Sequence, residues 1–202
     1  AGNIPVEQLR RSARDKLRLP SDEFMFLFVG QHIWEKNLEF LLEALAEIRT
    51  LPFRMYFIGS GYAASELRRK TEDLYLTDKV IFMGSITERE RLKLYYAAAD
   101  LFLFPSLYDN APLVVREAAA LHTPSLLIKG STSAEVIHDS VNGFLSDNSV
   151  TAYASRISQL LETPQLIAEA GEAASHSIAR SWEDVAEEVY DRYVNLIHRS
   201  GN

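Results

Sequence analysis

The sequence predicts an α/β fold, a Rossmann-like doubly wound parallel sheet of about six strands with a helical C-terminal tail. Two observations lead to this prediction. Short continuous apolar runs alternate with longer segments whose apolar residues recur at helical spacing, as expected for parallel strands that crossover helices bury on both faces. After residue 145 the pattern becomes helical throughout, which predicts the tail.

The expected strands are short apolar runs, most of which end at a glycine or a polar loop. They occupy residues 24–30, 53–59, 80–84, 100–104, 125–128 and 143–145. Amphipathic helices are expected between strands, where apolar residues recur at i, i+3 and i+4. These helices cover residues 37–49, 64–74, 88–99 and 112–121.

The tail divides into helices over residues 149–163, 164–180 and 181–198. Pro164 and Ser181 are the expected starts of the second and third of these helices, by fixed φ and by capping respectively. We therefore predict a single domain over residues 1–202. It contains a lead-in helix in 1–22, an α/β core in 24–145 and C-terminal helices in 149–199.

The composition is that of a globular protein with a sizeable core, since 47% of the residues are hydrophobic and 24% are charged. A net charge of −7 speaks against nucleic acid as a partner, because neutralising phosphates needs a surplus of Lys and Arg. The basic run EQLRRSARDKLR, residues 7–18, is interpreted as a solvent-exposed helix face. The absence of cysteine excludes a disulfide framework and a thiolate metal site in this sequence.

The longest apolar runs, such as FMFLFVG and ADLFLF, are far shorter than the roughly 20 residues of a membrane helix. No transmembrane segment is therefore expected, and no signal peptide is recognised before the first strand. We expect a cytoplasmic protein and leave contact with the inner face of the membrane open.

Ligands of open parallel sheets bind beyond the carboxyl ends of the strands, where loops enter helix N-termini. The loops that meet this condition read GQHIWEKN, GSGYAA, GSIT, PSLYDNAP and KGSTSAE. In GSGYAA, Gly59 and Gly61 fit the dinucleotide pattern G-x-G-x-x-A, although the next strand ends without the expected acidic residue. A tight glycine turn, and a turn whose bare backbone lies near a different nucleotide, remain open alternatives.

Lys36 follows Gly30 and stands just ahead of a predicted helix. A cation is poorly placed at a helix N-terminus, and a bound phosphate would resolve the conflict. A solvent-exposed lysine is the simpler alternative. His32 lies in the same loop, where a packing role is favoured over a catalytic one.

The stretch FPSLYDNAPLVVREAAALHTP contains a second helix start. Asn110 or Ala111 is the expected cap and Pro112 the first helical residue. The N–H groups of Leu113 and Val114 are then free to bind an anion.

Glu117 stands on this otherwise apolar helix, where a carboxylate needs hydrogen-bond donors. Vicinal ribose hydroxyls and a salt bridge to a residue such as Lys129 are both suitable, and spacing alone leaves the two open. The five histidines show no metal-ligand spacing, and there is neither a nucleophile elbow nor a Walker A pattern. Hydrolase, phosphotransferase and metal-site interpretations therefore lack support.

Taken in order, several motifs resemble one known family. They read FLFVGQHIWEKNLEFLLEAL, YFIGSG, VIFMGSI, YYAAADLFLFPSLYDNAPLVVREAAALHTP and GSTSAEVIHDSVNGFL. From about residue 24 to 145 the chain resembles the C-terminal, donor-binding half of a retaining glycosyltransferase of family 4, which has the GT-B fold. The resemblance implies transfer of a hexosyl unit from a UDP- or GDP-sugar to an acceptor hydroxyl, without an obligatory metal or other cofactor.

The resemblance also implies partners. These are the nucleotide sugar and an N-terminal acceptor domain, which is expected to be missing from this sequence and through which peripheral contact with a membrane is left open. Its acceptors would belong to bacterial envelope glycans or glycolipids. The alternatives are a dinucleotide-binding oxidoreductase domain and a non-catalytic nucleotide-sugar-binding module.

In the family, a Glu-x7-Glu motif directs its first carboxylate to the transferred hexose and its second to the ribose. The matching positions here are Asp109 and Glu117. The family's glycine loop carries Arg and Lys for the diphosphate. Lys36 matches the lysine, whereas Gln31 replaces the arginine and is unable to give its charged, bidentate contact.

The resemblance thus implies Lys36, Asp109 and Glu117 as the catalytic residues, with Ser85 and Ile86 at the nucleobase. The whole implied donor site consists of Gly30, Gln31, His32, Lys36, Gly59, Gly61, Ser85, Ile86, Asp109, Asn110, Ala111, Pro112, Leu113, Val114 and Glu117.

Overall fold

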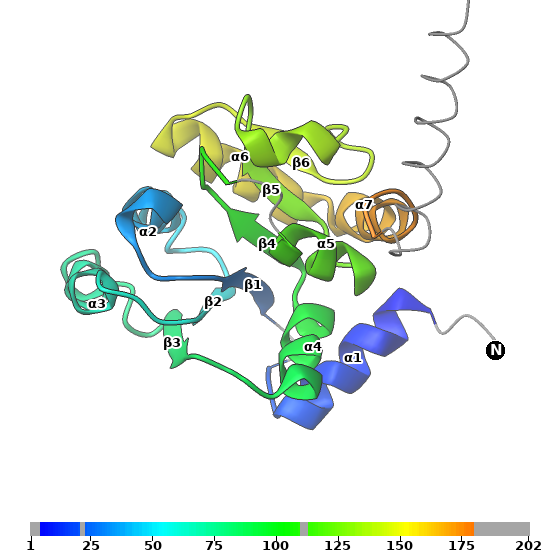
Figure 1. Cartoon of the computed structure of the whole chain (residues 1–202), viewed down its shortest axis with the longest axis horizontal. Coiled ribbons are helices and arrows are strands. Elements are labelled where there is room, and N and C mark those ends of the chain that lie inside the picture. The colour runs from blue at the N-terminus through cyan, green and yellow to red at the C-terminus, as the bar shows by residue number, and fades with distance from the viewer. Residues whose placement is uncertain (1–4, 21–22, 110–112, 180–202) are drawn as a thin grey trace, which may run out of the picture.

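The computed structural model describes residues 5–20, 23–109 and 113–179, and these form one parallel sheet flanked by helices (Figure 1). The strands are β1 (Phe24–Val29), β2 (Phe53–Ile58), β3 (Val80–Gly84), β4 (Leu101–Phe104), β5 (Ser125–Ile128) and β6 (Phe144–Ser146). Their order in the sheet is β3-β2-β1-β4-β5-β6. This is the doubly wound order of Rossmann-like folds, so the predicted fold class is confirmed.

The α-helices are α1 (Val6–Leu17), α2 (Leu38–Glu47), α3 (Ala64–Asp73), α4 (Arg89–Ala98), α5 (Leu113–Ala120), α6 (Val150–Glu162) and α7 (Pro164–Ser177). Short 3-10 turns, η1 (Trp34–Lys36) and η2 (Thr132–Val136), follow β1 and β5. Helix α2 contacts α3 and α6 on one side, while α4 contacts α1 and α5 on the other (Figure 1). Helices therefore cover both faces of the sheet.

The predicted strands are confirmed to within one residue at each end. The glycines Gly30 and Gly59 fall just outside β1 and β2, because their φ angles of 157° and 140° depart from strand geometry. Pro164 is confirmed as a helix start. The third predicted tail helix and its start at Ser181 lie outside the described residues, so the assignment of 1–202 to one domain stays a prediction.

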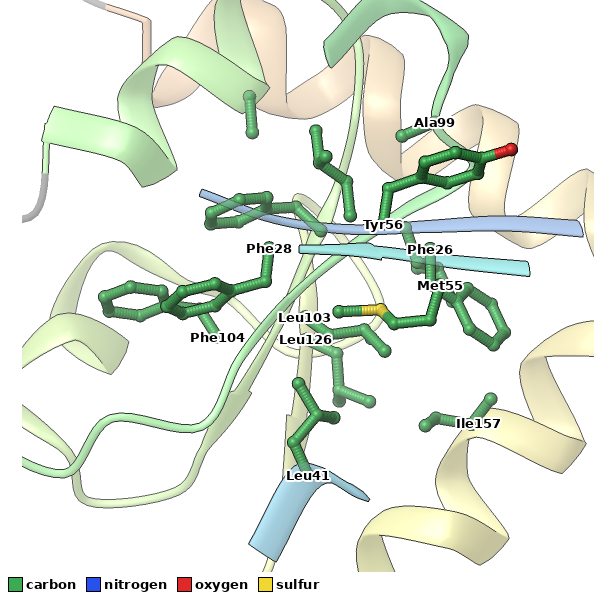
Figure 2. Close-up of a cluster of buried hydrophobic side chains, with 14 of the residues drawn as sticks. Phe26, Phe28, Leu41, Met55, Tyr56, Ala99, Leu103, Phe104, Leu126 and Ile157 are labelled. Atoms are coloured by element: carbon green, nitrogen blue, oxygen red, sulfur yellow. The ribbon is translucent and has the colours of Figure 1, made fainter. Parts of the chain in front are cut away.

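A line of phenylalanine rings joins the central strands (Figure 2). Phe26 of β1 stacks on Phe53 of β2 with ring centroids 5.2 Å apart, and Phe28 stacks on Phe104 of β4 at 5.9 Å. All four side chains are at most 1% exposed. Such pairs add about 0.5–1.5 kcal/mol each beyond the burial of their area. The carboxyl ends of β1 and β4 are therefore rigidly supported.

Asp100, directly before β4, anchors α1 to the amino ends of β1 and β4. Its Oδ2 accepts hydrogen bonds from Arg14 Nη2 at 2.5 Å and from the backbone N–H of Met25 at 2.7 Å. Arg14 also donates from Nε to the carbonyl oxygen of Ala98 at 3.0 Å and is only 7% exposed. The interpretation of residues 7–18 as a solvent-exposed face was therefore wrong for Arg14, which is buried because Asp100 and a backbone carbonyl satisfy its charge and N–H groups.

Replacing Asp100 by Ala is expected to lower the free energy of unfolding by about 3 kcal/mol, because it leaves a buried guanidinium and a buried N–H without partners. Urea denaturation followed by circular dichroism measures this loss.

Glu90→Ala is the matched control, since Glu90 forms an exposed ion pair with Lys93 on α4 and little change is expected there. A loss for Asp100→Ala no larger than that for Glu90→Ala would contradict the anchoring role.

Candidate functional site

The order of the strands fixes where a ligand site can form. Strands β1 and β4 are neighbours in the sheet. The chain continues from β1 to β2 on one side and from β4 to β5 on the other, so the loops after β1 and β4 diverge. In doubly wound sheets the ligand crevice lies at this point, outside the carboxyl ends of the strands. We call residues 30–37 and 105–109, which follow β1 and β4, the switch-point region.

Lys36 and Asp109 meet across the switch-point region. Lys36 Nζ forms an ion pair and hydrogen bond with Asp109 Oδ2, and it lies 5.7 Å from the centroid of the Phe104 ring. The two side chains are 18% and 20% exposed, so both are largely shielded from water. The structure thus brings together two of the three predicted catalytic residues, which stand 73 positions apart in the sequence.

The backbone around Lys36 is held by the loop after β4. Lys36 ends the turn η1, and Asn37 takes a left-handed conformation with φ of 57° before α2 begins. Asn is one of the residues that tolerate this conformation. The Asn37 side chain donates to the carbonyl oxygen of Pro105 at 3.3 Å, and the Ser106 hydroxyl donates to that of Glu35 at 3.4 Å. Lys36 is therefore fixed relative to β4 as well as β1.

Thr132 holds Asp109 from the opposite side. The Asp109 N–H donates to Thr132 Oγ1 at 2.8 Å, and the Thr132 hydroxyl donates to the carbonyl oxygen of Asp109 at 2.9 Å. The Thr132 N–H also donates to the carbonyl oxygen of Leu107 at 3.2 Å. Sequence reasoning placed KGSTSAE among the ligand-facing loops but missed Thr132, because hydrogen bonding of a side chain to a distant backbone leaves no local pattern.

Gly59 and Gly61 allow the loop after β2 to lie directly against the loop after β1. A Cβ atom at Gly59 would lie 1.9 Å from the carbonyl oxygen of Gly30, and one at Gly61 would lie 2.3 Å from that of His32. Hydrogen bonds between His32 N–H and Ser60 O, and between Ala63 N–H and His32 O, both 3.0 Å, join the two loops. This contact fits the tight-turn interpretation, which accounts for both glycines.

The imidazole of His32 packs against aromatic rings beneath the loop. The centroids of Phe28, Phe57 and Phe82 lie 6.3, 6.1 and 5.8 Å away, and the residue is 2% exposed. Burial, with a smaller contribution from the charge of Arg68, lowers the pKa of His32, so the ring is neutral at neutral pH. These contacts fit the packing role favoured for His32.

Glu117 lies on α5 beside a groove between α4 and α5. Its Oε2 accepts a hydrogen bond from the Tyr96 hydroxyl at 2.9 Å. The groove has a volume of about 180 Å³ and includes Arg89, Leu92 and Leu121 in its walls. Among the described residues Glu117 forms no ion pair with Lys129, and its hydrogen-bond donor is the phenol of Tyr96, although Arg89 and Lys93 also line the groove.

The other predicted residues occupy the same end of the sheet in different settings. Gln31, Ser85 and Leu113 are exposed, while Ile86 and Val114 are half-buried. Ser85 Oγ lies 2.9 Å from Ser60 Oγ, which joins the loops after β3 and β2.

Asn110, Ala111 and Pro112 lie outside the described residues, so the predicted cap of α5 stays a prediction. Within the described ranges no group of three or more His, Asp or Glu side chains is arranged to hold a metal ion. None of the helices described has the length and apolar character needed to cross a bilayer.

These features define the class of protein. The six-stranded parallel sheet with helices on both faces is the Rossmann-like arrangement found in GT-B glycosyltransferase structures. The chain belongs to the glycosyl transferases group 1 family, whose sequence model matches residues 10–177.

Known proteins resemble the chain along most of its length. The "D-inositol 3-phosphate glycosyltransferase 2" of Catenulispora acidiphila is 32% identical over 201 residues, which cover 93% of this chain and 47% of that protein. The sucrose-phosphate synthase of Thermosynechococcus elongatus superposes with a TM-score of 0.80 and 28% identity, over 94% of this chain and 49% of that one. The chain therefore spans about half the length of these relatives.

A further solved structure is that of Anabaena HepE in complex with UDP and glucose. It has a TM-score of 0.76 and 19% identity, over 96% of this chain and 55% of that one. At this identity the likeness concerns the fold alone.

Replacing Gly59 by Ala is expected to lower the free energy of unfolding by about 3 kcal/mol or more. The added Cβ would clash with backbone atoms of Gly30, which cannot relieve the clash by changing a side-chain rotamer. Thermal and urea denaturation measure the change.

Gly130→Ala is the matched control. Gly130 also has a positive φ, 81°, but a Cβ there would meet nothing within 4 Å. Only the cost of the left-handed conformation, about 1 kcal/mol, is expected. Equal losses for the two variants would mean that the contact between the loops contributes nothing.

Proposed function

We propose that the chain is the donor-binding, C-terminal half of a retaining glycosyltransferase of family 4. The enzyme transfers a hexosyl unit from a UDP- or GDP-sugar to an acceptor hydroxyl. The observation that carries this proposal is the meeting of Lys36 and Asp109 at the switch point of the sheet, beside the start of α5. Membership of the group 1 family supports the transferase class.

Lys36 and the start of α5 would bind the diphosphate. An ammonium group attracts the phosphate oxygens, and the first N–H groups of a helix have no partners within it. Leu113 is the first residue of α5, and its side chain is 66% exposed. As the bond between the anomeric carbon and the diphosphate breaks, negative charge grows on the leaving group, and these donors stabilise it.

Glu117 would bind the ribose of the same donor. It follows Leu113 by four residues, so both lie on one face of α5, about 6 Å apart along the helix axis. The diphosphate and the ribose are neighbours in a nucleoside diphosphate, which lets one ligand reach both positions. Vicinal hydroxyls are suitable donors to a carboxylate.

Asp109 would accept hydrogen bonds from hydroxyls of the transferred hexose. Thr132 binds both the N–H and the carbonyl oxygen of Asp109, and Lys36 binds its carboxylate. Gln31 contributes a neutral amide where the family carries a guanidinium. The donor site proposed here requires neither a metal ion nor another cofactor.

The relatives support finer parts of the proposal. HepE, which shares the fold, has been crystallised with UDP and glucose, and a UDP-hexose is the donor that we propose to test first. A further relative, 33% identical over 118 residues, is named as a putative teichuronic acid biosynthesis glycosyltransferase of Bacillus subtilis, which fits a role in envelope glycan synthesis. We propose that the acceptor is bound by a partner domain that faces the switch-point region.

Titration calorimetry of the chain with UDP, GDP and NADH tests the proposed ligand class. One of the two nucleoside diphosphates is expected to bind, and Lys36→Met to weaken it about tenfold, because a charge-assisted contact to phosphate is lost. The binding should also depend less on salt in this variant.

Lys16→Met provides the control, since Lys16 is an exposed lysine on α1 and its loss removes the same charge. Equal effects of the two lysine variants, or no binding of UDP and GDP, would refute the proposal. NADH binding alone would favour the oxidoreductase alternative.

Gln31→Arg is expected to tighten binding of the diphosphate about tenfold, because Gln31 is exposed in the loop after β1 and a guanidinium there adds a charged contact. The same titration measures the gain.

Gln8→Arg adds the same charge on α1, where the side chain is also exposed, and is expected to leave the affinity unchanged. If both arginines tighten binding equally, the gain reflects net charge and not a contact at Gln31.

A further inference from the structure

The hydrogen bond between Tyr96 and Glu117 joins α4 to α5 at the wall of the groove. Tyr96 is 2% exposed, and its ring packs on Phe102 with centroids 5.8 Å apart. Its carbonyl oxygen accepts a hydrogen bond from the Thr123 hydroxyl at 2.6 Å. The phenol is therefore held in one position by the core, whereas Glu117 is exposed.

An exposed glutamate samples several side-chain rotamers, and fixing one of them costs about 1.5–2 kcal/mol in entropy. The Tyr96 hydroxyl selects among these rotamers by binding Oε2 at 2.9 Å. The other carboxylate oxygen, Oε1, then remains available at the groove. A rigid donor from the core thus orders an exposed acceptor before any ligand arrives.

The chemistry of Tyr96 suits this role. Burial, followed by the charge of Glu117 and the hydrogen bond to it, raises the pKa of Tyr96 far above its usual value, so the phenol always keeps its proton. It donates to Glu117 at every physiological pH. Because it is neutral, it leaves the negative charge of the carboxylate available to hydroxyl donors, whereas a lysine at the same place would neutralise that charge.

We propose that Tyr96 is a positioning residue that orients Glu117 to accept hydrogen bonds from the vicinal hydroxyls of the donor ribose. This inference rests on the proposed function and adds to it the origin of ribose selectivity. Glu117 touches the ligand, while Tyr96 acts through Glu117 from within the core. Leu92 and Leu121 lie in the walls of the groove together with Arg89 and Lys93.

The test compares UDP with 2′-deoxy-UDP by titration calorimetry, or GDP with 2′-deoxy-GDP if GDP binds more tightly. The native chain is expected to prefer the ribonucleotide about tenfold, the size of one hydrogen bond to a charged group. Tyr96→Phe removes only the hydroxyl and keeps the ring on Phe102. The preference is expected to fall about fivefold, while the deoxynucleotide binds nearly as before.

Tyr95→Phe is the matched control, because Tyr95 is also buried on α4 but packs against Tyr56 on β2. The preference of this variant for the ribonucleotide should equal that of the native chain. Glu117→Ala should abolish the preference. Thermal unfolding of all the variants shows whether a change in binding reflects lost structure.

The outcomes separate the inference from the proposed function. A Tyr96→Phe variant that keeps the full preference, while Glu117→Ala loses it, would overturn the positioning role alone. A Glu117→Ala variant that keeps the preference, or a native chain that binds neither diphosphate, would overturn the assignment of Glu117 and with it the role of Tyr96.

Discussion

The seam between β1 and β4 is the constraint on which the rest of the structure depends. These strands pair over two residue pairs, Phe26 with Leu101 and Leu27 with Phe102, whereas β1 and β2 pair over six. Beyond the carboxyl end of the seam the loops diverge, because β1 continues to β2 and β4 continues to β5 on opposite sides. The strand pair at which a ligand is expected is therefore also the pair with the fewest paired residues in the described sheet.

Side chains compensate for the short ladder at both of its ends. At the amino end, Asp100 accepts hydrogen bonds from Arg14 and from the N–H of Met25, which ties α1, β1 and β4 together. At the carboxyl end, Lys36 and Asp109 join the loops that follow the same two strands. Stacked phenylalanine rings fill the space between (Figure 2). The positions of Lys36 and Asp109 therefore depend on how β1 and β4 pack against each other.

The sequence predicted those parts of the fold and site whose signals are local. Continuous apolar runs bounded by glycines defined the strands, because a buried parallel strand needs apolar residues on both faces. Lys36, Asp109 and Glu117 were chosen as candidate site residues from their positions in the sequence and from resemblance to a family, and their roles stay predictions. Their placement at one edge followed from the parallel order, since carboxyl ends of parallel strands share an edge.

The remaining features depend on pairings between distant residues. Arg14 looks like a surface residue in sequence, because nothing nearby indicates that Asp100, 86 positions away, will meet it. Thr132 and Tyr96 are ordinary members of a loop and a helix until the fold brings Asp109 and Glu117 beside them. Gly59 and Gly61 fit the dinucleotide pattern as well as a tight turn, and in the structure they make room for the carbonyl oxygens of a neighbouring loop. The glycine motif alone does not show whether the glycines are needed for a ligand or for the close contact between two loops.

The two ion pairs at the ends of the seam differ in a way that matches their places. Arg14 and Asp100 have side chains 9% and 12% exposed, while Lys36 and Asp109 are 18% and 20% exposed. Removing one partner from a buried pair is costly, so the first pair suits permanent anchoring. The second pair is more exposed than the first, and the ammonium group of Lys36 has three protons, of which one suffices for Asp109. In the proposed donor site, Lys36 would keep Asp109 and bind the diphosphate as a second anion, which would place the carboxylate beside the sugar that the diphosphate carries.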